Sequence, residues 1–420
     1  MRESPYPLEQ MLGMQFYGSD TPGTGGRLRA SAEDFIVEEV PCGIGTDGPF
    51  LICRLTKKDW DQQRALKEVG KRLGISYKRI GFTGTKDKHA ITSQLISLQG
   101  ITAEEIERVQ IRDISIEPVG RSPSPLALGS HTANRFTITI REARADPLIV
   151  SAVAEVCRTG IPNYYGIQRF GAIRPVTHTT GAYILKGDYE GAVCHYIGAA
   201  FPGETGAVKE ARTAFLEHRD PVRSLKEFPL RLNYERSMLH HIANHPGDYR
   251  GALRILPPKL LSMLVSAYQS LLFNRALSLR IADGGGLSEP LPGDRLLFAN
   301  GREDRVTGQN AGNARVQITR GRCRIALRVP GCRDEALACA DNTTMELLLS
   351  KDGITGGDFC TASDLVQARF DGASRPISLS AEVIASVCDD QIRLSFSLEP
   401  GQYATTLCRE FMKADPLMMV

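Results

Sequence analysis

The order of strand-like and helix-like segments constrains the fold of this chain more than any other feature. Short runs rich in β-branched and aromatic residues lie near both ends of the sequence, at 35–40, 50–55, 92–98, 136–141, 377–379 and 392–398. The middle of the chain is instead dominated by helical patterns. Both ends can share one sheet only if the middle folds separately. We therefore expect an α+β protein in which residues 1–171 and 373–420 form one discontinuous domain and residues 160–372 form an inserted domain.

The length of the chain agrees with this division. A protein of 420 residues is larger than one compact core usually organises. Its apolar content of 42% and charged content of 24% are those of an ordinary globular protein. No run approaches the roughly 20 apolar residues that span a bilayer, and the first ten residues lack the apolar core of a secretory signal. We expect a cytoplasmic protein with no membrane partner.

Cysteine and histidine usage predicts no metal or other cofactor. The ten cysteines include no Cys-x-x-Cys pair, and most have apolar neighbours, as Cys157 does in AEVCRTG. Cysteines in this pattern are usually buried and reduced, and zinc sites use closer ligand spacings. His240, His241 and His245 come closest to a metal-binding pattern, but we expect them on a polar surface segment without carboxylate partners.

Positive charge is concentrated in residues 51–90. This segment holds eleven lysines and arginines against four acidic residues, a local excess of +7, whereas the whole chain carries +3. A basic region on an otherwise balanced protein is typical of a surface that contacts phosphate groups. Taken alone, a solvated helix face explains the same charges equally well.

Much of this charge falls on a predicted helix over residues 60–73. Asp59 is placed to cap the helix and Gly74 to end it. Helical spacing puts four apolar residues on one buried stripe, namely Ala65, Leu66, Val69 and Leu73. Four basic residues then lie on the opposite, exposed face, namely Arg64, Lys67, Lys71 and Arg72.

Further patterns predict the remaining elements. Helices are expected at 179–198, 204–217, 258–282 and 361–370, and strands at 294–298, 314–318 and 322–328. Another helix begins at Pro147 with Asp146 as its cap and ends at Gly160. Its expected buried face consists of Leu148, Ala152, Val153 and Val156.

The loop over residues 81–89, GFTGTKDKH, carries the most distinctive chemistry. Walker A places Gly-Lys directly before Ser or Thr, whereas the second glycine here is followed by Thr85, so a P-loop is excluded. What remains is Asp87 between Lys86 and Lys88, directly after a predicted strand. Two cations favour an ionised carboxylate, which could act as a nucleophile or a base. By itself, such a triplet is more commonly a surface ion cluster.

Five segments, in order along the chain, resemble motifs of the TruD family of RNA pseudouridine synthases. Residues 84–94 resemble the signature G-x-K-D-K-x-A-x-T-x-Q, and residues 134–137 resemble the strand motif N-x-F-T. The segment IPNYYGIQRFG at 161–171 is similar to a third motif. The segments AEDFIVEE at 32–39 and PGQYATTLCRE at 400–410 also fit. Together the motifs cover both ends and the middle of the chain.

This resemblance implies a pseudouridine synthase-like catalytic domain with a mixed, largely antiparallel sheet, and an inserted α/β TRUD domain. It implies that Asp87 is the catalytic aspartate, which attacks the anomeric carbon of the ribose or assists loss of its 2′ proton. Phe136 falls on the aromatic residue that stacks against the target base, and Asn134 on a polar residue that lines the pocket. Arg29 falls near a basic residue that can pair with the aspartate. With Arg29 we place Lys86 and Lys88 among the substrate-binding residues.

The family resemblance also implies tRNA as the substrate, with the uridine at position 13 of the D-arm as the target, and no cofactor. The aromatic residues of 161–171 are expected to serve packing more than base contacts. Two alternatives stay open: an RNA-binding or RNA-chaperone protein on the same fold, and a synthase with broader RNA targets. We expect a monomer.

Overall fold

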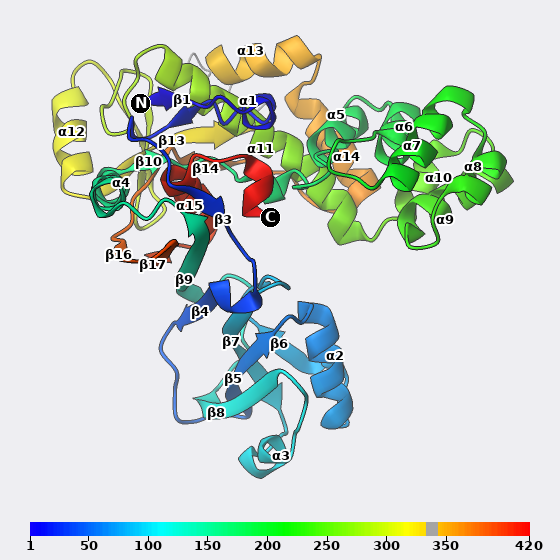
Figure 1. Ribbon diagram of the computed structural model, residues 1–420, viewed down its shortest axis with the longest axis horizontal. Helices are drawn as coiled ribbons and strands as arrows, with labels where there is room; N and C mark the ends of the chain where they lie inside the picture. The colour runs from blue at the N-terminus through cyan, green and yellow to red at the C-terminus, as the bar shows by residue number, and fades with distance from the viewer. Residues whose placement is uncertain (333–342) are drawn as a thin grey trace. The chain divides into compact units, whose positions relative to one another are not determined.

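The computed structural model describes residues 1–332 and 343–420, which divide into two compact units (Figure 1). The sheet unit consists of Ser19–Ile161 and Ser380–Met419. The helical unit consists of Met1–Gly18, Pro162–Leu379 and Val420. Among the described residues, no helix is long and apolar enough to cross a membrane.

The sheet unit is built around one nine-stranded sheet, whose strands follow the order β16-β17-β9-β4-β7-β5-β8, with β3 beside β9 and β6 beside β7. Only the β4–β7 pair is parallel, so the predicted mixed, largely antiparallel sheet is confirmed. The strands are β3 (Gly25–Arg27), β4 (Phe35–Pro41), β5 (Phe50–Lys58), β6 (Ile80–Phe82), β7 (Ile91–Gln99), β8 (Ile114–Ser122), β9 (His131–Ala143), β16 (Ile384–Cys388) and β17 (Gln391–Leu398).

The two ends of the chain meet between β9 and β17. These strands pair antiparallel, with Phe136 opposite Phe396, and the two rings are stacked with centroids 5.5 Å apart. A cross-strand aromatic pair of this kind fixes the register of the two strands. The α+β arrangement expected from strand-like segments at both ends is therefore confirmed.

Helix α2 (Gln62–Arg72) packs its apolar stripe onto the sheet. Leu66 and Val69 are fully buried against residues of β5, β6 and β7. The basic residues Arg64, Lys67, Lys71 and Arg72 are exposed, as predicted. The predicted cap is wrong: the side chain of Asp61 accepts the Arg64 N–H, whereas Asp59 adopts a left-handed backbone with φ of 56°.

Three further helices complete the sheet unit: α3 (Ala103–Glu107), α4 (Pro147–Thr159) and α15 (Ala404–Met412). Asp146 caps α4 through the N–H groups of Leu148 and Ile149, as predicted. The predicted buried face of α4 is partly wrong, because Val150, Val153 and Cys157 are buried while Leu148 is 82% exposed. The apolar composition of the helix leaves two overlapping stripes, and the choice between them comes from tertiary packing.

The helical unit is organised around α11 (Pro258–Ala282), the longest helix, whose predicted bounds are confirmed. The predicted single helix at 179–198 is wrong, because α5 ends at Leu185 and α6 starts at Tyr189, with Gly187 between them at φ of 71°. The helices besides α11 are α1 (Pro7–Met11), α5 (Thr177–Leu185), α6 (Tyr189–Gly198), α7 (Gly206–His218), α8 (Pro221–Glu227), α9 (Asn233–Asn244), α10 (Tyr249–Arg254), α12 (Ala311–Thr319), α13 (Thr343–Asp352) and α14 (Gly356–Val366).

A four-stranded antiparallel sheet, ordered β12-β11-β13-β14, lies in the same unit. The predicted strand at 314–318 is wrong, because these residues form most of α12. Their alternating pattern suggested a half-buried strand, yet only Ala314 of α12 is buried. The strands are β11 (Arg295–Phe298), β12 (Glu303–Arg305), β13 (Cys323–Val329) and β14 (Ala373–Pro376), besides the short β1 (Arg2–Glu3), β2 (Phe16–Tyr17), β10 (Ile161–Pro162) and β15 (Ser378–Leu379).

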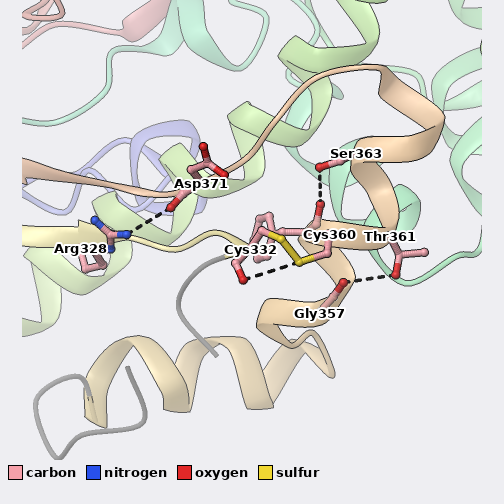
Figure 2. The surroundings of a disulfide bond; sticks show 8 residues. Arg328, Cys332, Gly357, Cys360, Thr361, Ser363 and Asp371 are labelled. Atoms are coloured by element: carbon pink, nitrogen blue, oxygen red, sulfur yellow. Dashed lines mark hydrogen bonds between the residues drawn. A yellow bond between two sulfur atoms is a disulfide. The ribbon is translucent and has the colours of Figure 1, made fainter. Parts of the chain in front are cut away.

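One pair of cysteines departs from the sequence expectation. Cys332, just beyond β13, forms a disulfide with Cys360 in α14 (Figure 2). The expectation of reduced cysteines is wrong for this pair, because their 28-residue separation in the sequence gives no indication that β13 and α14 bring them together. Cys53, Cys157 and Cys408 are buried free thiols, as expected. Cys339 lies outside the described residues.

Leu66→Ala tests whether the core under α2 holds the sheet unit together. Leu66 is fully buried, so truncation should lower the free energy of unfolding by about 2–5 kcal/mol through lost apolar contact and a residual cavity. Urea denaturation followed by circular dichroism measures this loss. The exposed neighbour Lys67→Ala is the control and should change stability by less than about 0.5 kcal/mol. Equal effects of the two substitutions would contradict the observed burial.

Candidate active site

The loop between β6 and β7 carries Asp87, and hydrogen bonds from strand β5 and from the loop before β9 hold its backbone. The Thr83 carbonyl accepts the Gly129 N–H at 2.7 Å. The Lys57 ammonium, at the end of β5, donates to the backbone carbonyl of Asp87 at 2.6 Å. These bonds fix the backbone on either side of Lys86 and leave the Asp87 side chain 48% exposed.

Arg29 pairs with this carboxylate. Its Nη2 lies 3.2 Å from Asp87 Oδ2, and the arginine side chain is only 14% exposed. The guanidinium also lies over the ring of Phe35, with its Cζ 4.1 Å from the ring centroid. Arg29 has a left-handed backbone with φ of 56°, an uncommon conformation for a residue with a side chain. The structure therefore brings together Arg29 and Asp87, which lie 58 residues apart.

Lys86 and Lys88 have different surroundings, although they flank the same aspartate. The Lys86 ammonium lies 2.8 Å from the Glu39 carboxylate, and both side chains are buried. The other oxygen of Glu39 accepts the Leu95 N–H at 3.3 Å. Lys86 is thus an internal anchor of the loop as well as part of the cavity wall. Lys88 is exposed and does not line the cavity.

Lys57 is a second buried cation beneath the loop. Its side chain is 2% exposed, and burial lowers the pKa of its ammonium to about 8, against the opposing attraction of Asp87. In the sequence, Lys57 is one of eleven basic residues in the segment 51–90, and no motif distinguishes it from the others. Its role depends on the strand register that turns Lys57 inward and Lys58 outward.

A cavity of about 360 Å³ opens beside Asp87. Phe136 and Asn134 of β9 form part of its wall, together with Val37, His131, Pro400 and Gly401. The Phe136 ring is held by Phe396 on one side and by the edge of Phe35, whose centroid is 6.2 Å away. These two neighbouring rings therefore fix the orientation of the surface that Phe136 presents.

Asn134 contributes a hydrogen-bond acceptor that has no partner in the described structure. Its Nδ2 donates to His131 Nε2 at 3.1 Å, whereas its Oδ1 is buried and has no partner among the residues that the structure describes. Burial, together with the charge of Lys86, lowers the pKa of His131, so its ring is neutral near pH 7. Buried acceptors are nearly always satisfied, which makes Asn134 Oδ1 a candidate contact for a ligand.

Residues 161–171 lie almost entirely in the helical unit. Tyr164 and Phe170 are fully buried, which agrees with the expected packing role. The Arg169 guanidinium donates to Ser270 Oγ at 3.1 Å, and Gly171 adopts a φ of 91°. This motif therefore maintains local structure within the helical unit.

The histidine cluster in α9 differs from its prediction in one respect. His241 Nε2 lies 2.8 Å from the Asp248 carboxylate, so the expected lack of a carboxylate partner is wrong. Within the described parts of the chain, no group of three or more His, Cys, Asp or Glu side chains is arranged to hold a metal ion.

Several similar proteins carry the same name. The chain matches the profile of the family "tRNA pseudouridine synthase D (TruD)" over residues 11–411. A Methanosarcina acetivorans protein named "Probable tRNA pseudouridine synthase D" is 37% identical, with 98% of each chain covered. A protein of that name from Halobacterium salinarum is 36% identical over the whole of both chains. A crystal structure of a Methanosarcina mazei protein, assigned provisionally as tRNA pseudouridine synthase D (TruD), superposes on this chain with a TM-score of 0.83 at 34% identity. The superposition covers 99% of this chain and 100% of that chain.

The shifted pKa of Lys57 predicts a pH-dependent stability. Because burial lowers that pKa to about 8, while an unfolded lysine titrates near 10.4, the unfolded state binds more protons between these values. Through this residue, folding stability therefore rises with pH across that window. Urea denaturation at about pH 7.5 and pH 9.5 measures the effect. Between these pH values, the free energy of unfolding should rise more for the wild type than for Lys57→Met, which lacks the titrating group.

Lys58→Met is the matched control for this experiment. Lys58 is the next residue on β5, and a hydrogen bond to Glu33 raises its pKa rather than lowering it. Lys58→Met should therefore keep the wild-type gain between the two pH values. The same gain in Lys57→Met would show that Lys57 does not titrate in this window.

Proposed function

The chain belongs to the tRNA pseudouridine synthase D (TruD) family, and from this membership we propose that it isomerises uridine to pseudouridine in tRNA, at position 13 of the D-arm. The observation that carries the proposal is the half-exposed Asp87 carboxylate, paired with Arg29 at 3.2 Å and lying at the wall of a cavity of about 360 Å³. Ligand cavities are commonly of this size or larger.

The reaction exchanges one glycosidic bond for another within the same nucleotide. The N1–C1′ bond of uridine breaks, the base turns, C5 bonds to C1′, and the proton on C5 is lost while N1 gains one. Asp87 would act at the ribose, either by attacking C1′ or by removing the 2′ proton. Both routes need a carboxylate that reaches the sugar while the base is held in the cavity. The exposure of Asp87 and its place in the cavity wall support either role.

Phe136 and Asn134 supply what a detached base needs. A base must leave its stack to enter an enclosed site, which costs a few kcal/mol, and an aromatic surface returns about 1–3 kcal/mol by stacking. The Phe136 ring, fixed by Phe35 and Phe396, is such a surface. Asn134 Oδ1, which has no partner in the described structure, could accept the N3–H of uracil.

Arg29 would position the carboxylate rather than contact the base. Its guanidinium is engaged by Asp87 and by the Phe35 ring, so the orientation of Asp87 depends on it. Lys86 would act in the same indirect way, because its ammonium is paired with Glu39. Lys88 is exposed next to the site and would contact the RNA backbone.

The exposed face of α2 is a second part of the proposed RNA surface. Arg64, Lys67, Lys71 and Arg72 point away from the core, and basic side chains in this arrangement bind phosphates. The sheet unit would accordingly be the catalytic domain and the helical unit the inserted TRUD domain. We further propose a monomeric, cytoplasmic enzyme.

Asp87→Asn tests the proposed catalytic group. The substitution removes the carboxylate and keeps its size, so formation of pseudouridine in an unmodified tRNA transcript should fall at least about a thousandfold while the protein stays folded. Carbodiimide-stop primer extension locates the modified uridine. Asp59→Asn is the control, since Asp59 has the left-handed backbone that asparagine tolerates, and it should retain activity.

Three outcomes of this assay have different meanings. A fully active Asp87→Asn protein would remove Asp87 from the catalytic role. A wild-type protein that binds tRNA but forms no pseudouridine would favour the RNA-chaperone alternative. Product at a position other than 13, or in other RNAs, would favour the synthase with broader targets.

Replacement of Lys67, Lys71 and Arg72 by glutamine tests the α2 surface. The slope of log Kd against log salt should decrease by about 0.9 for each side chain that contacts a phosphate. Filter binding of tRNA at several salt concentrations measures it. The control replaces three exposed lysines outside this face, namely Lys186, Lys209 and Lys351, and should leave the slope closer to that of the wild type. An unchanged slope in the α2 variant would move the RNA surface elsewhere.

A further inference from the structure

The helical unit contains a larger hollow that the proposed reaction does not use. It measures about 550 Å³ and is lined by residues of β11, of the β11–β12 turn, of β12 and of α12, and by Arg322. Residues 299–329, which contain much of its wall, hold seven arginines, no lysine and two acidic residues. This is a second concentration of positive charge, distinct in sequence and composition from the lysine-rich segment 51–90.

An arginine and an aromatic ring form one wall of the hollow. The guanidinium carbon of Arg302 lies 4.4 Å above the centroid of the Phe298 ring, and both residues line the hollow. The Asp304 carboxylate lies 3.5 Å from the same guanidinium. The ring and the carboxylate contact the guanidinium, whose side chain is 62% exposed, and the carboxylate offsets its charge. A guanidinium of this kind is a surface on which an unpaired base can stack.

Another part of the lining consists of polar side chains from α12 and from Arg322. Asn313 and Gln317 are four residues apart on α12, hence on one face, and both line the hollow with Arg322. In the part of the chain that the structure describes, the side chains of these three residues make no hydrogen bond or ion pair. Asn310 differs, because its amide closes the turn before α12 through Thr307 and Arg305.

We propose that this hollow, formed by Phe298, Arg302, Asn313, Gln317 and Arg322, binds one unpaired nucleotide of the RNA substrate. The base stacks on the Arg302 guanidinium, the two amides contact the base edge, and Arg322 pairs with the phosphate. Amides offer both donors and acceptors to a base, and arginine matches the geometry of a phosphate. The inference rests on the proposed function for the identity of the RNA, whereas the binding site itself is independent of Asp87.

The first test compares Arg302→Gln and Arg322→Gln with Arg320→Gln. All three remove one charge, but Arg320 is exposed and does not line the hollow. For the unmodified tRNA transcript, we expect Kd and KM to rise about tenfold in the first two variants, with kcat unchanged at saturating tRNA. Arg322→Gln should also lower the salt slope of binding by about 0.7, the value for one phosphate contact to a single strand. Arg320→Gln should change Kd less than twofold.

The second test asks whether a single base occupies the hollow. Abasic sites are introduced one at a time at the unpaired positions of the transcript, and Kd is measured for the wild type and for Arg302→Gln. At one position, the abasic site should weaken binding to the wild type about tenfold but weaken binding to Arg302→Gln much less, because the stacking partner is already lost. Other positions should affect both proteins equally.

The outcomes separate this inference from the proposed activity. If the wild type forms pseudouridine but the hollow variants bind tRNA like Arg320→Gln, the hollow is not an RNA site and the proposed function stands. If binding depends on the hollow but the wild type forms no pseudouridine, the proposed function fails and the nucleotide site stands. Additive effects of Arg302→Gln and every abasic site would overturn the claim that one base stacks there. The proposal would also be overturned if a free mononucleotide stabilised the wild type against heat while the hollow variants bound tRNA as tightly as the wild type.

Discussion

The buried ion pair between Lys86 and Glu39 is the interaction on which the proposed active site depends. Two charges taken out of water are costly unless they are close and otherwise satisfied, and here the atoms are 2.8 Å apart while Glu39 also accepts the Leu95 N–H. The pair ties the residue next to Asp87 to β4. Because the Lys57 ammonium also donates a hydrogen bond to the Asp87 carbonyl, the backbone on both sides of the carboxylate is fixed. Only the Asp87 side chain is left to reach outward.

This arrangement explains why a lysine-aspartate-lysine triplet can be more than a surface ion cluster. In such a cluster all three charges would be solvated, and each would contribute little to stability. Here Lys86 is buried, Asp87 is half exposed and Lys88 is exposed. The three charges thus face three environments, and the aspartate contacts a cation, Arg29, from a distant part of the chain. That geometry supports a positioned carboxylate.

The sequence allowed the sheet, the long helix α11 and the group of Arg29, Asp87, Asn134 and Phe136 to be predicted, and the structure places these four residues together around or beside one cavity. It did not reveal Lys57 or Glu39, because their roles depend on which strand face turns inward, and neighbouring basic residues have the same local pattern. The strand predicted at 314–318 failed for a related reason. A short alternating segment has no intrinsic preference strong enough to resist its packing as α12. The Cys332–Cys360 disulfide likewise depends on contacts between distant elements.

The two basic regions differ in a way that suits different tasks. On α2, the lysines and arginines form an exposed face, and cations on such a face can contact phosphates without regard to sequence. Residues 299–329 around α12 hold arginines and no lysine, and Arg302 contacts both an aromatic ring and a carboxylate at the wall of a hollow. Fixing a guanidinium plane contributes nothing to long-range attraction, but it is required for stacking and for directional hydrogen bonds. A site-specific enzyme must both attract RNA and distinguish one position in it. In the proposed enzyme, the cations of α2 would serve the first requirement, and Arg302 beside the amides of Asn313 and Gln317 would serve the second.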